Sequence, residues 1–110
     1  MATAPVDTTT LTAIINQCFS YATDARVSVP DQNTFLIEGK RLRGQLLNLL
    51  SAKFDSTSPQ FTAASTSLKA VNTSLSQSAT ALANAATTLN NIANLVSNLD
   101  KLLAVATSFV

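Results

Sequence analysis

Large apolar residues recur at intervals of seven through the second half of the chain, in a stretch without glycine or proline. A second, mostly apolar row lies three residues further on. The first row comprises Phe61, Leu68, Leu75, Leu82, Leu89, Val96, Leu103 and Val110, and the second comprises Ala64, Val71, Ser78, Ala85, Ile92, Leu99 and Ala106. Two rows with this spacing keep one side of a helix against other helices. We call them the heptad seam, and they predict an all-α protein in which helix packing dominates.

The start of the seam helix is marked by Ser58 and Pro59. A serine hydroxyl caps free backbone N–H groups, and proline fits the first helical position, where no N–H is needed. No breaker follows, so we predict one long helix over about 59–108, which would be about 75 Å long at 1.5 Å per residue. The alternative is a four-helix up-down bundle with a break near 72–91, where Ser, Thr and Asn cluster. The unbroken heptad phase favours the long helix.

Two shorter helices are predicted before the seam, over about 7–25 and 30–54. The first has a capping residue at Asp7 and an apolar face, and the second begins near Pro30. We therefore expect a single domain over 1–110, with 1–6 as a flexible N-terminal tail. In this antiparallel bundle the two shorter helices pack on the long one.

The second helix carries a wide apolar stripe and both glycines of the chain, Gly39 and Gly44. Its main core candidates are Phe35, Leu42, Leu46, Leu49, Leu50 and Phe54, and Leu36 and Leu47 widen the stripe. A wide stripe predicts contact with more than one neighbour. Each glycine costs about 1 kcal/mol relative to alanine in a helix interior. The glycines are either tolerated weak points or, at Gly39, a place where another backbone comes close.

Composition argues against catalysis. The chain lacks histidine, its six carboxylates form no pair at i, i+3 or i+4, and it has no glycine-rich phosphate loop. Its one cysteine, Cys18, lies on the apolar face of the first helix, where we expect a buried and inert thiol. With 12% charged residues and a net charge of +1, nothing favours nucleic acid. We predict no enzyme, no metal, no cofactor and no small-molecule substrate.

The sequence shows neither a signal peptide nor a transmembrane segment. The expected location is therefore cytoplasmic by default, with export that needs no cleaved signal as the alternative.

The predicted function is a non-enzymatic helical interaction or assembly module, acting through the heptad seam on a protein partner or by self-association. The residues predicted to contact the partner are Leu75, Leu82, Leu89, Val96, Leu99 and Leu103. The competing interpretation is that the first two helices of the same chain fill the seam. Charged residues at Leu82 and Leu89 would abolish association in the first case and unfold the monomer in the second.

Two further functions remain as alternatives. One is a membrane-active protein resembling a component of a helical pore, because low charge and an apolar end allow amphipathic insertion. The other is a binder of an acidic partner through the basic cluster at 38–43, where Lys40, Arg41 and Arg43 would make the contacts.

Overall fold

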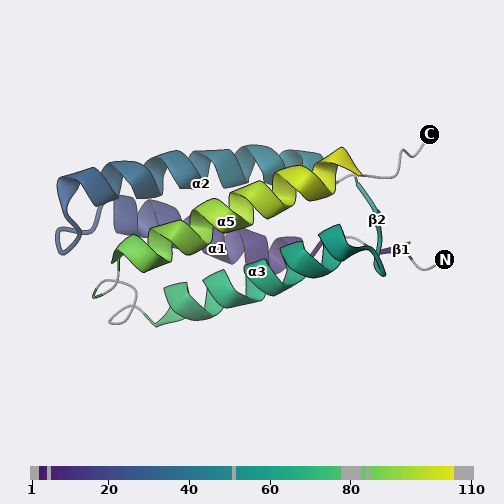
Figure 1. Ribbon diagram of the computed structural model, residues 1–110. Coiled ribbons are helices and arrows are strands. Elements are labelled where there is room, and N and C mark those ends of the chain that lie inside the picture. The colour runs from purple at the N-terminus through teal and green to yellow at the C-terminus, as the bar shows by residue number, and fades with distance from the viewer. Residues whose placement is uncertain (1–2, 5, 51, 78–82, 84, 106–110) are drawn as a thin grey trace.

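The computed structural model describes residues 3–4, 6–50, 52–77, 83 and 85–105. Its described helices are α1 (Thr8–Ala22), α2 (Val29–Leu49), α3 (Pro59–Ser76) and α5 (Ala85–Ala104). Two short strands, β1 (Thr3–Ala4) and β2 (Phe54–Asp55), pair antiparallel at one end of the helices (Figure 1). The predicted all-α class is confirmed, since helices make up the body of the molecule.

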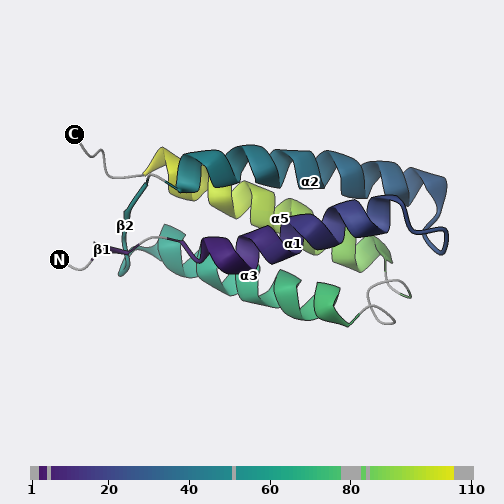
Figure 2. The same ribbon diagram turned by 180° about the vertical axis from the view of Figure 1, so that it is seen from behind.

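The four described helices lie side by side, and consecutive helices run in opposite directions (Figures 1 and 2). α1 packs on α2 and α3, and α5 packs on the same two helices from the other side. Each helix therefore has two neighbours from the same chain, and a common core lies between the four.

The starts of α1 and α3 follow from their caps. The Asp7 carboxylate accepts hydrogen bonds from the Thr10 amide at 3.0 Å and the Thr10 hydroxyl at 2.6 Å. The Ser58 hydroxyl accepts one from the Phe61 amide at 3.2 Å, and Pro59 occupies the first turn of α3. The predicted starts at Asp7 and at Ser58–Pro59 are confirmed, because these side chains satisfy amides that have no partner within the helix.

α2 ends at Leu49, so the prediction of a helix over 30–54 is wrong at its C-terminus. The chain leaves the helix there and crosses the end of the bundle, which lets Phe54 enter the core from β2 and lie 6.4 Å from the Phe61 ring. β2 also holds the N-terminal segment, since Thr3 pairs with Asp55 and Ala4 with Phe54. Val6 is buried as well. Within the tail predicted for 1–6, Thr3 and Ala4 are thus paired with β2 and Val6 is packed in the core.

The long helix predicted over 59–108 is wrong, and the chain has the break that the alternative placed near 72–91. α3 ends at Ser76, and α5, which begins at Ala85, packs back along it. The Tyr21 hydroxyl donates a buried hydrogen bond of 2.9 Å to the Leu75 carbonyl, one of those that the end of α3 leaves without a partner. Folding back also lets the two halves of the seam bury each other within one chain.

The core contains most of the described seam residues and the inner faces of α1 and α2. Gly39 lies in it, opposite α1. A Cβ added at Gly39 would lie 3.1 Å from the Cβ of Cys18 and 3.1 Å from Cε1 of Phe19. Of the two explanations for this glycine, the structure therefore supports the close approach of another backbone.

Candidate interaction surfaces

The seam residues predicted to bind a partner lie in the core of the single chain. Leu75, Leu89 and Leu99 are buried, and Val96 and Leu103 are partly buried and pack against the core. Leu82 lies outside the described residues. Helices of the same chain therefore cover Leu75, Leu89 and Leu99, whereas Val96 and Leu103 keep part of their surface exposed in the space between α2 and α5. Binding of a partner through these residues stays a prediction.

The three cations of the basic cluster are all exposed but do not converge on one point. Arg41 donates a hydrogen bond from Nη1 to the buried Glu38 carboxylate at 3.1 Å. Arg43 turns toward α1, where its guanidinium carbon lies 5.5 Å from the centre of the Phe19 ring. Lys40 and Arg43 are three residues apart and share a side of α2. The cluster thus offers two cations on one surface rather than a three-cation pocket.

Two polar side chains of α2, Glu38 and Gln45, are buried, which the sequence did not predict, and Gln45 contacts α5. The Gln45 side-chain amide donates hydrogen bonds to the Val96 carbonyl at 2.9 Å and to Asp100 Oδ1 at 2.7 Å. Glu38 Oε2 and Gln45 Oε1 are buried and have no hydrogen-bond partner among the described residues. Glu38 and Gln45 are seven residues apart beside the core row of Phe35 and Leu42. This spacing, equal to that between Phe35 and Leu42, was the feature of the sequence that could have predicted their burial.

The side of α2 that faces away from the bundle carries exposed apolar residues in both halves of the helix, with Lys40, Arg43 and Gly44 between them. Leu50 was predicted for the core, and Leu36 and Leu47 were predicted to widen its stripe, but all three are exposed. We define the outer face of α2 by five exposed apolar residues: Val29 (67% exposed), Leu36 (37%), Ile37 (50%), Leu47 (68%) and Leu50 (61%). Among the described residues, the other large apolar side chain with comparable exposure is Val105. Lys40 and Arg43 fall within this face, at helical spacing from Leu36 and Leu47.

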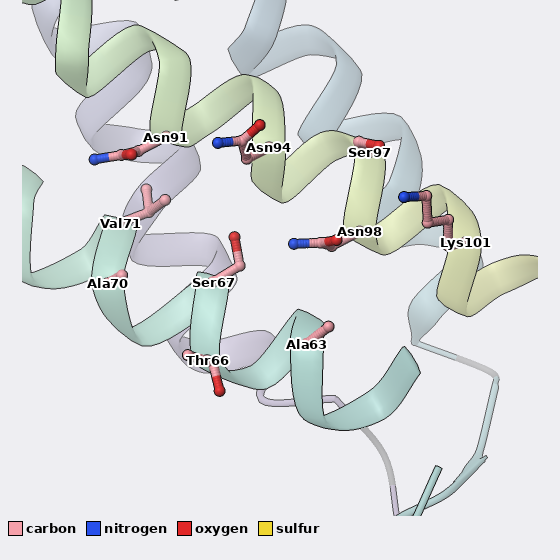
Figure 3. A pocket seen from close by; sticks show the side chains of 10 residues that line it. All are labelled: Ala63, Thr66, Ser67, Ala70, Val71, Asn91, Asn94, Ser97, Asn98 and Lys101. Carbon is pink, nitrogen blue, oxygen red and sulfur yellow. The ribbon is translucent and has the colours of Figure 1, made fainter. Parts of the chain in front are cut away.

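A groove of about 500 Å³ lies between α3 and α5 (Figure 3). Its α5 side carries Asn91, Asn94, Ser97, Asn98 and Lys101, and its α3 side carries Ala63, Thr66, Ser67, Ala70 and Val71. These amides and hydroxyls can form hydrogen bonds, but the lining includes no carboxylate, thiol or imidazole to transfer a proton.

A second groove, of about 460 Å³, runs between α2 and α5 beside the outer face, and we call it the α2–α5 groove. It is lined by Arg41, Gly44, Gln45, Asn48, Val96, Asp100 and Leu103. Gly44 stands where this groove meets the outer face. The groove therefore continues the exposed surface of α2 toward α5.

The pKa values of Cys18 and Asp24 are shifted by their local surroundings. Burial, and then the negative charge of Glu38, raise the pKa of the Cys18 thiol to about 12, so almost no thiolate forms at neutral pH. Hydrogen bonds from the side chain and backbone of Arg26 lower the pKa of Asp24 to about 2 and fix the turn after α1. In the part of the chain that the structure describes, no three His, Cys, Asp or Glu side chains gather as metal ligands would.

None of the described helices combines the length and apolarity needed to cross a bilayer. Comparison of the chain with protein-family models, with curated proteins and with solved structures gives no match.

Proposed function

We propose that the protein is a non-enzymatic helical interaction module whose protein partner packs on the outer face of α2. The observation that carries the proposal is the concentration of exposed apolar side chains on that one helix. The heptad seam supports the bundle, and the outer face of α2 makes the contact. The function is the one predicted from the sequence, but the partner binds α2 instead of the heptad seam.

Burial of apolar surface supplies the free energy for such a contact. Val29, Leu47 and Leu50 each expose more than 60% of their surface, and Ile37 exposes half. Removing apolar surface from water contributes about 25 cal/mol per Å², and large exposed apolar patches usually mark contact surfaces. Isolated exposed leucines need no such explanation, but four exposed apolar residues on one side of α2, with a fifth at its C-terminal cap, do.

The polar regions support a role without catalysis. The groove between α3 and α5 is lined by amides, hydroxyls and Lys101, without a carboxylate, thiol or imidazole, and Cys18 is buried with a raised pKa. The carboxylate of Glu38 is buried and is held by Arg41 of the same helix. These groups position helices and have no reacting partner nearby.

The test is the binding of a neutral amphipathic peptide of leucine and glutamine, about 18 residues long, which would match most of the length of α2. We expect fluorescence anisotropy to show saturable binding to the intact protein. The double variant Ile37→Gln and Leu47→Gln should weaken this binding by about tenfold or more, as expected when about 1.4 kcal/mol of apolar contact is lost. Val105→Gln is the matched control, because it removes an exposed apolar side chain outside α2. Absence of binding, or equal binding by the double variant, would overturn the proposal.

Light scattering behind a sizing column asks whether the partner is a second copy of the chain. We expect a mass of 11.5 kDa that does not change with protein concentration. A dimer that Ile37→Gln and Leu47→Gln dissociate would place a second copy on the outer face. A dimer that persists in this variant would show that another surface associates, and would contradict the role given to α2.

A further inference from the structure

We propose that the segment recognised by the outer face of α2 is an acidic amphipathic helix, and that it makes its closest approach at Gly44. This inference rests on the proposed function, since it names the chemistry of the partner at the same surface. Two observations carry it: the charges within the outer face, and the surroundings of Gly44.

Within the outer face the charges are positive, and the adjoining α2–α5 groove adds the cation Arg41 and one carboxylate, Asp100, whose Oδ1 accepts a hydrogen bond from Gln45. Lys40 and Arg43 are exposed between the apolar residues of the face. The carboxylates of the same helix lie elsewhere, because Asp31 is half-buried and Glu38 is buried and paired with Arg41. An anionic partner complements such a surface, whereas a second copy would bring like charges together.

Gly44 has no role inside the described structure. Neither glycine has a positive φ, so the backbone does not require one. A Cβ built at Gly44 would meet nothing within 4 Å, whereas the same atom at Gly39 would press on α1. Glycine in a helix interior is unfavourable relative to alanine, and two helices approach more closely where one of them lacks a side chain. The open space at Gly44 leaves room for another backbone to approach α2 from outside.

The surroundings of Gly44 suit a crossing helix. Lys40 and Leu47 lie one helical turn from it on either side, Ile37 lies two turns away, and the α2–α5 groove opens beside it. The face runs from Val29 to Leu50, which is about 30 Å of helix at 1.5 Å per residue. A partner helix of four or five turns can bury leucines on both sides of Gly44 while its acidic residues reach Lys40 and Arg43.

A lipid surface is the competing occupant, because apolar residues with interspersed cations also suit an anionic membrane. A bilayer adapts to the side chains it receives and needs no glycine at a fixed position. The behaviour of Gly44 variants therefore separates the two.

The experiment compares three peptides that share one leucine face and differ only in the polar face, which carries Glu, Gln or Lys. We expect the Glu peptide to bind about tenfold more tightly than the Lys peptide at low salt, because two exposed ion pairs each contribute a few-fold. Added salt should reduce this preference. Lys40→Gln with Arg43→Gln should remove it, whereas the control Lys69→Gln, an exposed cation on α3, should leave it unchanged.

The glycine is tested with Gly44→Ala and Gly44→Leu, with the melting temperature measured for each. Neither variant should melt lower than the parent protein, because the site is open. Gly44→Ala should weaken binding of the Glu peptide, and Gly44→Leu should abolish it. Undiminished binding by Gly44→Leu would overturn the inference.

The remaining outcomes separate the inference from the proposed function. Equal binding of all three peptides, still lost in Ile37→Gln with Leu47→Gln, would keep the interaction module and refute the acidic partner. Binding of no peptide would refute both. Binding to phosphatidylserine vesicles that Gly44→Leu does not affect, together with weak binding of the Glu peptide, would replace the acidic helix by a membrane surface.

Discussion

The two glycines of α2 provide a matched test of the packing described above. Both lie within the same helix, and alanine at either position gains the same helix propensity. They differ in what the added methyl group meets. At Gly44 there is nothing within 4 Å, and at Gly39 the new Cβ lies 3.1 Å from Cys18 Cβ and 3.1 Å from Phe19 Cε1.

These distances give the expected magnitudes. Gly44→Ala should raise the free energy of unfolding by about 1 kcal/mol, the propensity difference alone. At Gly39 the same gain is opposed by contacts about 0.4 Å shorter than the ordinary carbon–carbon separation of ~3.5 Å. The Cβ of Cys18 is fixed to the backbone of α1, so α1 and α2 must separate to relieve them. Overpacking of this kind costs about 1–3 kcal/mol, so the two variants should differ by that amount.

Urea unfolding followed by circular dichroism measures the difference. Both variants should retain the m-value of the parent protein, so that shifts of the midpoint report stability. The melting temperature of Gly44→Ala should rise by about 4 °C or more, since 1 kcal/mol has roughly that effect in a domain of this size. An equal gain from Gly39→Ala would refute the close packing of α1 on α2. A loss of stability from Gly44→Ala would refute the open surface at that position.

Four further outcomes follow from individual contacts. Tyr21→Phe should lower the free energy of unfolding by about 1–3 kcal/mol, because the buried Leu75 carbonyl loses its donor; an unchanged urea midpoint would contradict this role. Leu99→Ala should cost about 2–5 kcal/mol, with a melting temperature independent of protein concentration, since Leu99 is fully buried within one chain. Asp7→Ala should cost about 1 kcal/mol at pH 7 as a lost cap. Hydrogen bonds from the Thr10 hydroxyl and amide lower the pKa of Asp7 below 3.8, so its contribution is complete above about pH 4 and is lost as the pH falls through the lower folded value. The variant should therefore show a weaker decline of stability in acid, and an identical acid profile would refute the cap. The Cys18 thiol should react with a disulfide reagent at pH 8 only upon unfolding, because its pKa is raised to about 12; rapid reaction of the native protein would contradict its burial.

The helix class and the helix starts could be predicted because they depend on local chemistry. Apolar periodicity fixes which side of a helix is buried, and Asp7 and Ser58 satisfy amides within their own first turn. The end of α3 could be placed only within the range 72–91, from its Ser, Thr and Asn residues. The hydrogen bond at that end could not be predicted, since the Tyr21 hydroxyl lies 54 residues from Leu75 in the sequence and meets its carbonyl only in the folded bundle.

The regular heptad spacing led to the wrong prediction of one long helix, because the spacing of apolar residues is also a local feature of the sequence. Leu68 and Leu75 lie in α3 and Leu89 lies in α5, all with one spacing and all buried. In two helices that pack antiparallel, each needs its own apolar stripe, but neither needs to be in phase with the other along the chain. An unbroken repeat is therefore compatible with a hairpin, and it does not show that the helix continues between Leu75 and Leu89.

The outer face of α2 could be predicted only in part from the sequence, because the burial of a side chain depends on how many helices pack against its own helix. Lys40 and Arg43 could be identified as exposed cations from composition alone. The stripe of α2 was wide enough to predict more than one neighbour, and the structure supplies two, α1 and α5. Those neighbours cover Leu42 and Leu49 and leave Leu36, Leu47 and Leu50 exposed. These exposed leucines belong to the surface on which we propose that a partner helix packs, and Gly44 lies between Leu36 and Leu47 on that surface.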